Sequence, residues 1–188
     1  FYNYRQMTKA LPFFVSAIEK IEQTDPSEII FPAASYTKIG FYMGTIGDYK
    51  EAINYLKKAI QFTDENSVEF ATISDNLGAY YLKIGDIKNA KYFIEKASKA
   101  AKVNRYKVRY AKTLGNLALL EERDKNFSGA IKLVLEDIQI SEENQSNQNT
   151  MYAYTLLARL YIANNESDKA KEAIKKADAI AKSKSYFK

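Results

Sequence analysis

The feature that most constrains the fold of this chain is a segment that occurs twice. Residues 46–60, IGDYKEAINYLKKAI, return 38 positions later as IGDIKNAKYFIEKAS at residues 84–98. In both copies a Gly-Asp pair precedes an amphipathic stretch. Such a pair is typical of one helix that ends at glycine and a next helix that aspartate caps. The repetition therefore predicts copies of one helix–turn–helix unit.

Small residues recur at the same phase along the whole chain. An alanine follows each turn at a nearly regular spacing: Ala10, Ala52, Ala90, Ala130 and Ala170. Seven positions later stands a second small residue, except at Asp137, and together the two positions trace one helical stripe. Gly40 and Gly78 recur twelve positions before their alanines. A mid-helix glycine costs about 1 kcal/mol against alanine, so both predict close approach of a second helix.

A period of about 40 residues with two helices per unit indicates an α-solenoid. The pattern resembles the tetratricopeptide repeat family, on residues that lie mainly in two units: Gly40, Gly47, Asp48, Tyr49, Ala52 and Ala59, then Gly78, Tyr81, Gly85, Asp86, Ala90 and Ala97. The third unit departs from the pattern at Ala118, Lys125 and Asp137, and the fourth has Asn164–Ser167 as its turn. The resemblance implies an all-α superhelix of antiparallel helix pairs. HEAT repeats, which share the longer period but not the phasing, are the alternative.

These phases predict a single array over residues 1–188, with an unpaired helix at about 4–23 and repeats at about 26–64, 66–103, 104–145 and 146–186. The helix pairs are expected at 32–46 with 49–62, 67–84 with 87–102, 105–123 with 127–144, and 148–163 with 167–185. Asp25-Pro26-Ser27-Glu28 favours a helix start near 26, whereas Pro32 favours a start near 32, and the sequence leaves both open. The polar stretch from Ser141 to Asn149 is expected to be an exposed connection.

Composition removes several kinds of chemistry. The chain has no Cys and no His, which excludes thiolate nucleophiles, Cys/His zinc sites and histidine acid–base catalysis. There is no glycine-rich phosphate loop, so we expect no enzyme, no metal and no cofactor. Basic residues number 28 and acidic residues 23, and their interleaving argues against nucleic acid as the partner. No apolar run approaches the ~20 residues of a membrane helix, so this segment is not expected to insert into a membrane, and the compartment stays open between cytoplasm and periplasm.

The resemblance implies that first helices line a concave groove. The binding residues it places there are Thr37, Phe41, Asp75, Asn76, Lys112, Asn116, Leu119, Tyr152 and Arg159. Asn76 and Asn116 share one phase, which suggests a ladder of amides for the main chain of a peptide; the alternative is a solvated face. The family's two-carboxylate clamp is matched only at Asn76 and Lys112, which argues against binding of a chaperone tail.

The densest basic run extends from Lys99 to Lys112 and contains Tyr106 and Tyr110. One interpretation is a phosphate or nucleic-acid patch with stacking rings. The other is a solvated helix end whose tyrosines pack against the neighbouring repeat.

The sequence as a whole predicts a protein–protein interaction module that binds an extended peptide or a partner helix, as a segment of a larger regulatory or scaffold protein. The alternative is the peptide-sensing domain of a bacterial multi-repeat signalling or transcriptional regulator. The chain begins on a second helix and ends at Tyr186-Phe187-Lys188 without a polar cap. Further stacked repeats or a homodimer are therefore expected.

Overall fold

The structure, a computed structural model, describes residues 4–103 and 105–183, and only the backbone of residues 4–11. Within these ranges all regular structure is helical, which confirms the expected all-α class. The chain divides into two compact units, Phe1–Thr63 and Asp64–Lys188. None of the helices in the described part is long and apolar enough to cross a membrane.

The first unit contains α1 (Tyr4–Gln23), the short 3-10 helix η1 (Pro26–Glu28), α2 (Pro32–Ile46) and α3 (Tyr49–Ile60). The start of α2 at Pro32 settles the question that the sequence left open. Asp25 instead caps η1, because its Oδ1 accepts the N–H of Ser27 at 2.9 Å. α1 packs against the pair through Phe14, whose ring stacks on Tyr42 at 4.2 Å between centroids.

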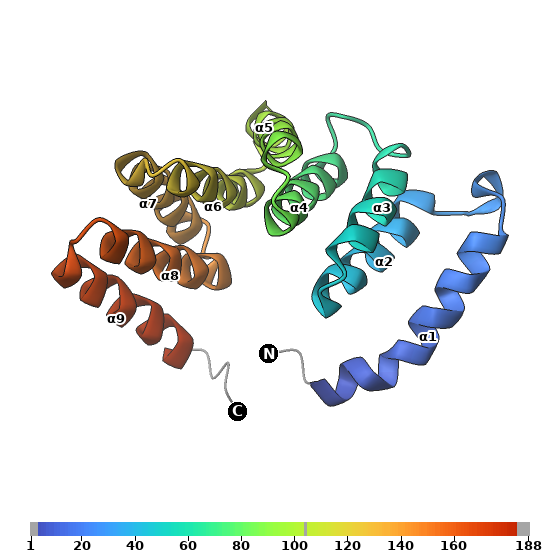
Figure 1. Ribbon diagram of the computed structural model, residues 1–188, viewed down its shortest axis with the longest axis horizontal. Coiled ribbons are helices and arrows are strands. Elements are labelled where there is room, and N and C mark those ends of the chain that lie inside the picture. Colours follow the sequence, from blue (N-terminus) through green and yellow to red (C-terminus); the bar gives the residue numbers. More distant parts are fainter. Residues whose placement is uncertain (1–3, 104, 184–188) are drawn as a thin grey trace. The chain divides into compact units, whose positions relative to one another are not determined.

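The second unit consists of three helix pairs (Figure 1): α4 (Val68–Ile84) with α5 (Ile87–Val103), α6 (Lys107–Arg123) with α7 (Phe127–Glu143), and α8 (Asn147–Ala163) with α9 (Ser167–Ser183). The first helices of successive pairs contact one another, α4 with α6 and α6 with α8, more extensively than the second helices do. A stack whose helices lie closer together on one side curves toward that side. The helices α4, α6 and α8 therefore form the concave face of this unit.

The two mid-helix glycines lie where helices cross closely, as predicted. Both are buried. A Cβ on Gly40 would lie 2.8 Å from Leu56 Cγ, and one on Gly78 would lie 2.3 Å from Ile94 Cγ1. Leu56 and Ile94 are themselves fully buried, so the glycines allow these large side chains to fill the space between paired helices.

The turns keep one conformation even where the sequence loses glycine. The left-handed residue is Gly47 or Gly85 in the first two full repeats, and Lys125 (φ 60°) or Asn165 (φ 61°) in the others. Connections between repeats use the same device at Arg105 and Gln145. The N–H of the next residue then reaches back to the end of the preceding helix, as from Asn126 to the carbonyl of Glu121 at 2.8 Å. From residue 85 onward this turn recurs at a constant interval, at positions 85, 105, 125, 145 and 165.

Candidate functional site

Most of the binding residues expected from the sequence lie on the concave face of the second unit. Asp75 and Asn76 are on α4, Lys112, Asn116 and Leu119 are on α6, and Tyr152 and Arg159 are on α8. Thr37 and Phe41 are half-buried on α2 in the first unit, so they belong to a different body.

Two of these residues share a groove between α4 and α6, which we call the α4–α6 groove. Its volume is about 360 Å³. Asn116 and Leu119 contribute from α6, and the other lining residues are Ala79, Leu82, Lys83, Glu122 and Arg123. Leucine and alanine side chains therefore meet charged and amide groups in one depression.

The amide groups of the proposed ladder are partly engaged within the protein. Asn116 Nδ2 donates to Asp75 Oδ1 at 2.7 Å, and Asn76 Nδ2 donates to the carbonyl of Thr72 at 2.7 Å. Asp75 is only 6% exposed, so it supports Asn116 from below instead of offering a carboxylate to a ligand. Each amide retains a carbonyl oxygen that can accept a hydrogen bond.

At the other edge of α6, Arg159 joins α8 to the groove. Its Nε donates to Glu122 Oε1 at 3.0 Å and its Nη2 to Oε2 at 2.5 Å, a bidentate pair that orients Glu122. Tyr152, on the same helix as Arg159, is 59% exposed and leaves an aromatic surface open to solvent.

Asp137 occupies the place of the second small residue, and the structure shows how it is accommodated. It is buried, and its Oδ1 accepts hydrogen bonds from Ser141 Oγ (2.9 Å) and Asn149 Nδ2 (2.7 Å). Gly115 of α6 faces it, since a Cβ there would lie 3.5 Å from Asp137 Oδ2. Ser141 and Asn149 are thus buried ends of the polar stretch that was expected to be exposed, and that expectation was wrong for them.

Burial determines the protonation of both carboxylates. Burial raises the pKa of Asp137 to about 7, against the smaller lowering by hydrogen bonds from Ser141 and Asn149. It raises the pKa of Asp75 to about 6, although the hydrogen bond from Asn116 and the positive charge of Arg109 act in the opposite direction. Two sequence signals pointed to the Asp137 network: an aspartate in an alanine position, and a glycine, Gly115, at the phase that Thr37 and Asp75 occupy in the earlier repeats.

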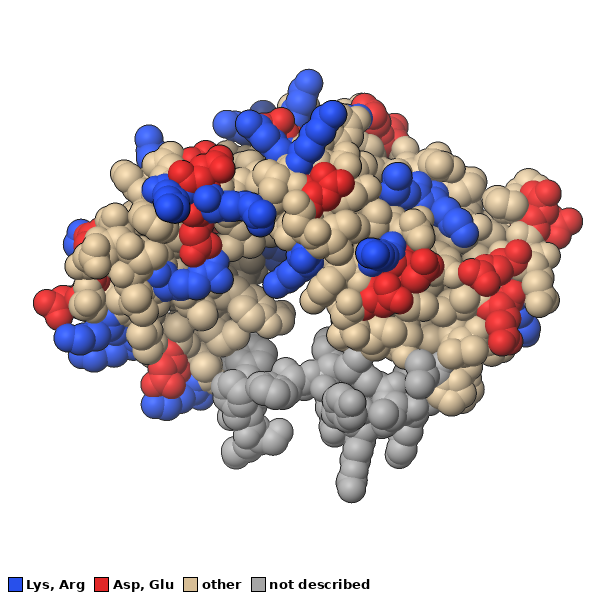
Figure 2. Space-filling view, in the orientation of Figure 1, with Lys and Arg blue, Asp and Glu red and all other residues tan. Residues whose placement is uncertain are grey.

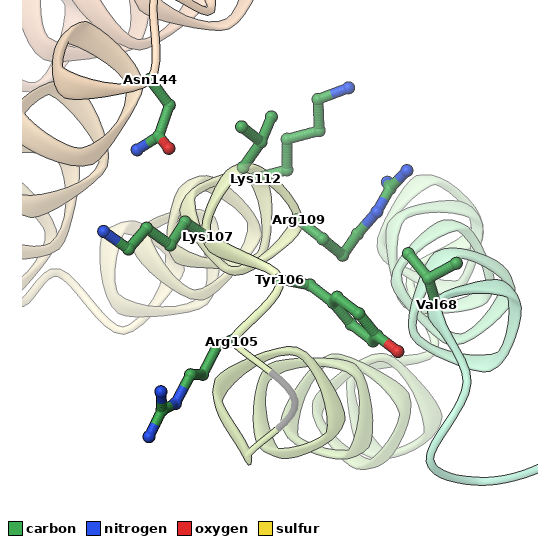
Figure 3. A pocket seen from close by; sticks show the side chains of 8 residues that line it. Val68, Arg105, Tyr106, Lys107, Arg109, Lys112 and Asn144 are labelled. Carbon is green, nitrogen blue, oxygen red and sulfur yellow. The ribbon is translucent and has the colours of Figure 1, made fainter.

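The basic run divides into two groups around the start of α6. Tyr110 faces α7, where its hydroxyl donates to Glu136 Oε1 at 3.2 Å, and Lys102 Nζ lies 5.6 Å from its ring centroid. The other group lines a pocket of about 400 Å³, which we call the basic pocket (Figure 3). It is formed by Val68, Arg105, Tyr106, Lys107, Val108, Arg109, Lys112 and Asn144.

The geometry of these sites suits recognition through side chains. Among the residues the structure describes, no three Asp or Glu side chains come together as metal ligands.

The architecture, antiparallel helix pairs stacked side by side, is that of an α-α solenoid. Residues 33–66 and 152–184 match the tetratricopeptide repeat family. These two segments are thus tetratricopeptide repeats, which confirms the resemblance there.

Solved structures show a similar fold over nearly the whole chain. MamA is 22% identical, with a TM-score of 0.62 over 90% of this chain and 87% of its own. Aspartyl phosphate phosphatase F from Bacillus subtilis is 18% identical, with a TM-score of 0.80 over 99% of this chain and 49% of its own. The Rap conjugation gene regulator of the plasmid pLS20, in complex with the Phr* peptide, is 18% identical, with a TM-score of 0.80 over 96% and 50%.

The chain spans about half the length of the phosphatase and of the Rap regulator. At these identities the likeness establishes the fold. No curated protein matches the sequence.

Proposed function

We propose that the second unit is a protein–protein interaction module that binds an extended peptide along α4, α6 and α8. The observation that carries this proposal is the α4–α6 groove. It lies on the concave face, has the volume of a few side chains, and sets Leu82 and Leu119 among Lys83, Glu122 and Arg123. Protein interaction is also the usual role of stacked helical repeats, whose concave surfaces bind partners.

Each part of the groove has a distinct role in this proposal. Leu119 and Leu82 bury an apolar side chain of the peptide, at about 25 cal/mol per Å² removed from water. The free carbonyl of Asn116 accepts a main-chain N–H, while its bond to Asp75 fixes the amide orientation. Tyr152 adds exposed aromatic surface on α8, the first helix of the next pair.

The test is selection of peptides from a random display library, with the chain as bait, followed by calorimetric titration of a selected peptide. Leu119→Asn removes the apolar contact, and we expect affinity to fall about tenfold, the equivalent of roughly 1.4 kcal/mol. The matched control is Leu135→Asn, because Leu135 is a 46% exposed leucine on the second helix α7. Equal loss in both variants would contradict the placement of the peptide in the groove.

A second function is favoured by one comparison, the likeness to about half of the Rap regulator that was solved with a peptide. In this alternative the array is the sensing part of a regulator, and peptide binding changes its curvature. Hydrogen exchange of α4–α9 with and without a selected peptide tests it. Protection limited to the groove residues, with none at the α5–α6 and α7–α8 turns, would argue for the simple module.

A further inference from the structure

The basic pocket is a strongly positive depression. It is lined by four cationic side chains, those of Arg105, Lys107, Arg109 and Lys112. No carboxylate is among its lining residues. Tyr106 and Val68 provide an aromatic and an apolar wall. The sequence showed a basic run from Lys99 to Lys112, and the structure shows which cations of that run line one pocket.

The protein itself neutralises this charge poorly. The nearest pairing is between Arg109 Nη1 and Asp75 Oδ2, at a long 3.9 Å, and Asp75 already accepts a hydrogen bond from Asn116. Arg109 Nε is buried without a hydrogen-bond partner. Lys112 is exposed, yet the pKa of its ammonium is lowered by partial desolvation and then by the nearby positive charge of Arg109, as expected for two cations that repel each other. A ligand with negative charge relieves this repulsion.

The directions of the side chains favour an extended anion over a compact one. In Figure 3, Lys107 points toward Asn144 and Arg109 points toward α4. Arg105 and Lys112 point in two other directions, away from Asn144 and from each other. A single phosphate or carboxylate could contact only one or two of them. A chain of several negative charges can contact them in turn.

The basic pocket and the α4–α6 groove follow one face of α6. Lys112 and Asn116 are four residues apart and Leu119 is three further on, so they are neighbours along the helix. At about 1.5 Å per residue, the distance from Lys112 to Leu119 is about 10 Å. An extended peptide covers this distance in about three residues. One peptide can therefore reach both sites.

A peptide fits these features better than a nucleic acid does. Tyr110, the second ring of the basic run, bonds to Glu136 of α7 through its hydroxyl and does not line the basic pocket, so only Tyr106 could stack on a base there. On the face drawn in Figure 2, basic side chains are interspersed with acidic ones instead of forming a long stripe. Nucleic-acid binders usually concentrate their charge along such a stripe.

We propose that the basic pocket binds an acidic segment of a peptide, about three residues away from an apolar side chain that occupies the α4–α6 groove. This inference rests on the proposed function, because the groove supplies the apolar half of the site. It adds the chemical class of the partner, which is an acidic peptide.

The experiment uses two fluorescein-labelled probes and measures their binding by anisotropy. The acidic probe has four glutamates, a Gly-Ser spacer and two leucines, and in the neutral probe glutamines replace the glutamates. In about 50 mM salt the acidic probe should bind about tenfold more tightly, and the advantage should shrink at about 200 mM because exposed charges are then screened.

Arg105→Asn/Lys107→Gln should weaken the acidic probe about fivefold and leave the neutral probe unchanged, since two exposed ion pairs are lost. Asparagine tolerates the left-handed backbone of Arg105. The control, Lys125→Asn/Lys132→Gln, removes the same charge, and Lys125 has the same backbone conformation on an exposed turn. This control variant should change the affinity of either probe very little.

Equal affinity of the two probes, or equal weakening by the two double variants, would overturn the acidic-peptide site. Tighter binding of a single-stranded oligonucleotide with the same number of charges would assign the pocket to nucleic acid instead. The proposed function fails separately. In that case Leu119→Asn leaves both probes unaffected while Arg105→Asn/Lys107→Gln still weakens the acidic one.

Discussion

Substitution of one buried glycine tests whether paired helices meet as closely as the structure shows. The Cβ of Gly78→Ala would lie 2.3 Å from Ile94 Cγ1 and 3.1 Å from the carbonyl oxygen of Ala90. Ile94 is fully buried, and Cγ1 lies near its backbone, so relief requires α4 and α5 to separate. Overpacking of this kind costs about 1–3 kcal/mol, and alanine returns about 1 kcal/mol through its helix propensity. A contact of 2.3 Å is severe, so we expect the upper end of that cost and a net destabilisation of about 2 kcal/mol.

Urea unfolding of the whole chain, followed by far-UV circular dichroism, measures this change. Gly115→Ala is the matched control, because Gly115 also lies inside a helix but its Cβ would meet only Asp137 Oδ2, at an ordinary 3.5 Å. There the helix propensity is unopposed, and a gain of up to about 1 kcal/mol is expected. The two identical substitutions should therefore have opposite signs.

A gain of stability in Gly78→Ala comparable with that in Gly115→Ala would refute the close crossing of α4 and α5. A double-mutant cycle with Ile94→Ala gives a second reading. If Ile94 is the side chain that clashes, its truncation should cost less in the Gly78→Ala background than alone.

Three further outcomes follow from the structure. Burial raises the pKa of Asp137 from 3.8 to about 7, so the folded state binds the proton more tightly and this group lowers stability as pH rises from about 4 to about 7. Asp137→Asn, which keeps the accepting Oδ1, should therefore raise the melting temperature at about pH 8 and much less at about pH 5. Lys125→Gly should stabilise by up to about 1 kcal/mol in urea unfolding, because glycine adopts φ 60° without steric cost. Arg159→Ala should cost less than about 1 kcal/mol, since the Arg159 side chain is 57% exposed, and a larger loss would show that the pair with Glu122 is structural.

The sequence predicted the helices well because the determinants of their ends are local. The stripe of alanines and the Gly-Asp turns gave α4–α9 to within a few residues. The start of α2 was ambiguous, because Pro26 and Pro32 both suit the first turn of a helix. In the structure residues 26–28 form a single 3-10 turn that Asp25 caps, and α2 begins at Pro32.

The site was less accessible to sequence reasoning, because it depends on lateral contacts between repeats. Asn76 and Asn116 share one phase, yet only Asn116 donates to Asp75. Phase alone does not give the offset between α4 and α6. The hydrogen bonds of Asp137 likewise connect α7 with α8 across a turn. The basic run was visible in the sequence, but which of its cations line one pocket depends on how the start of α6 lies against Val68 of α4 and Asn144 after α7.

The constant interval between the left-handed turns determines how such a chain can change in length. Removal or duplication of one whole helix pair with its two turns, such as 107–146, leaves every remaining helix on its own side of the stack. A change by a single helix would place a former outer helix on the inner side, where its large exposed residues would meet buried alanines. Variants of this protein that differ in repeat number are therefore expected to differ by whole pairs of helices, and an engineered extension should follow the same step.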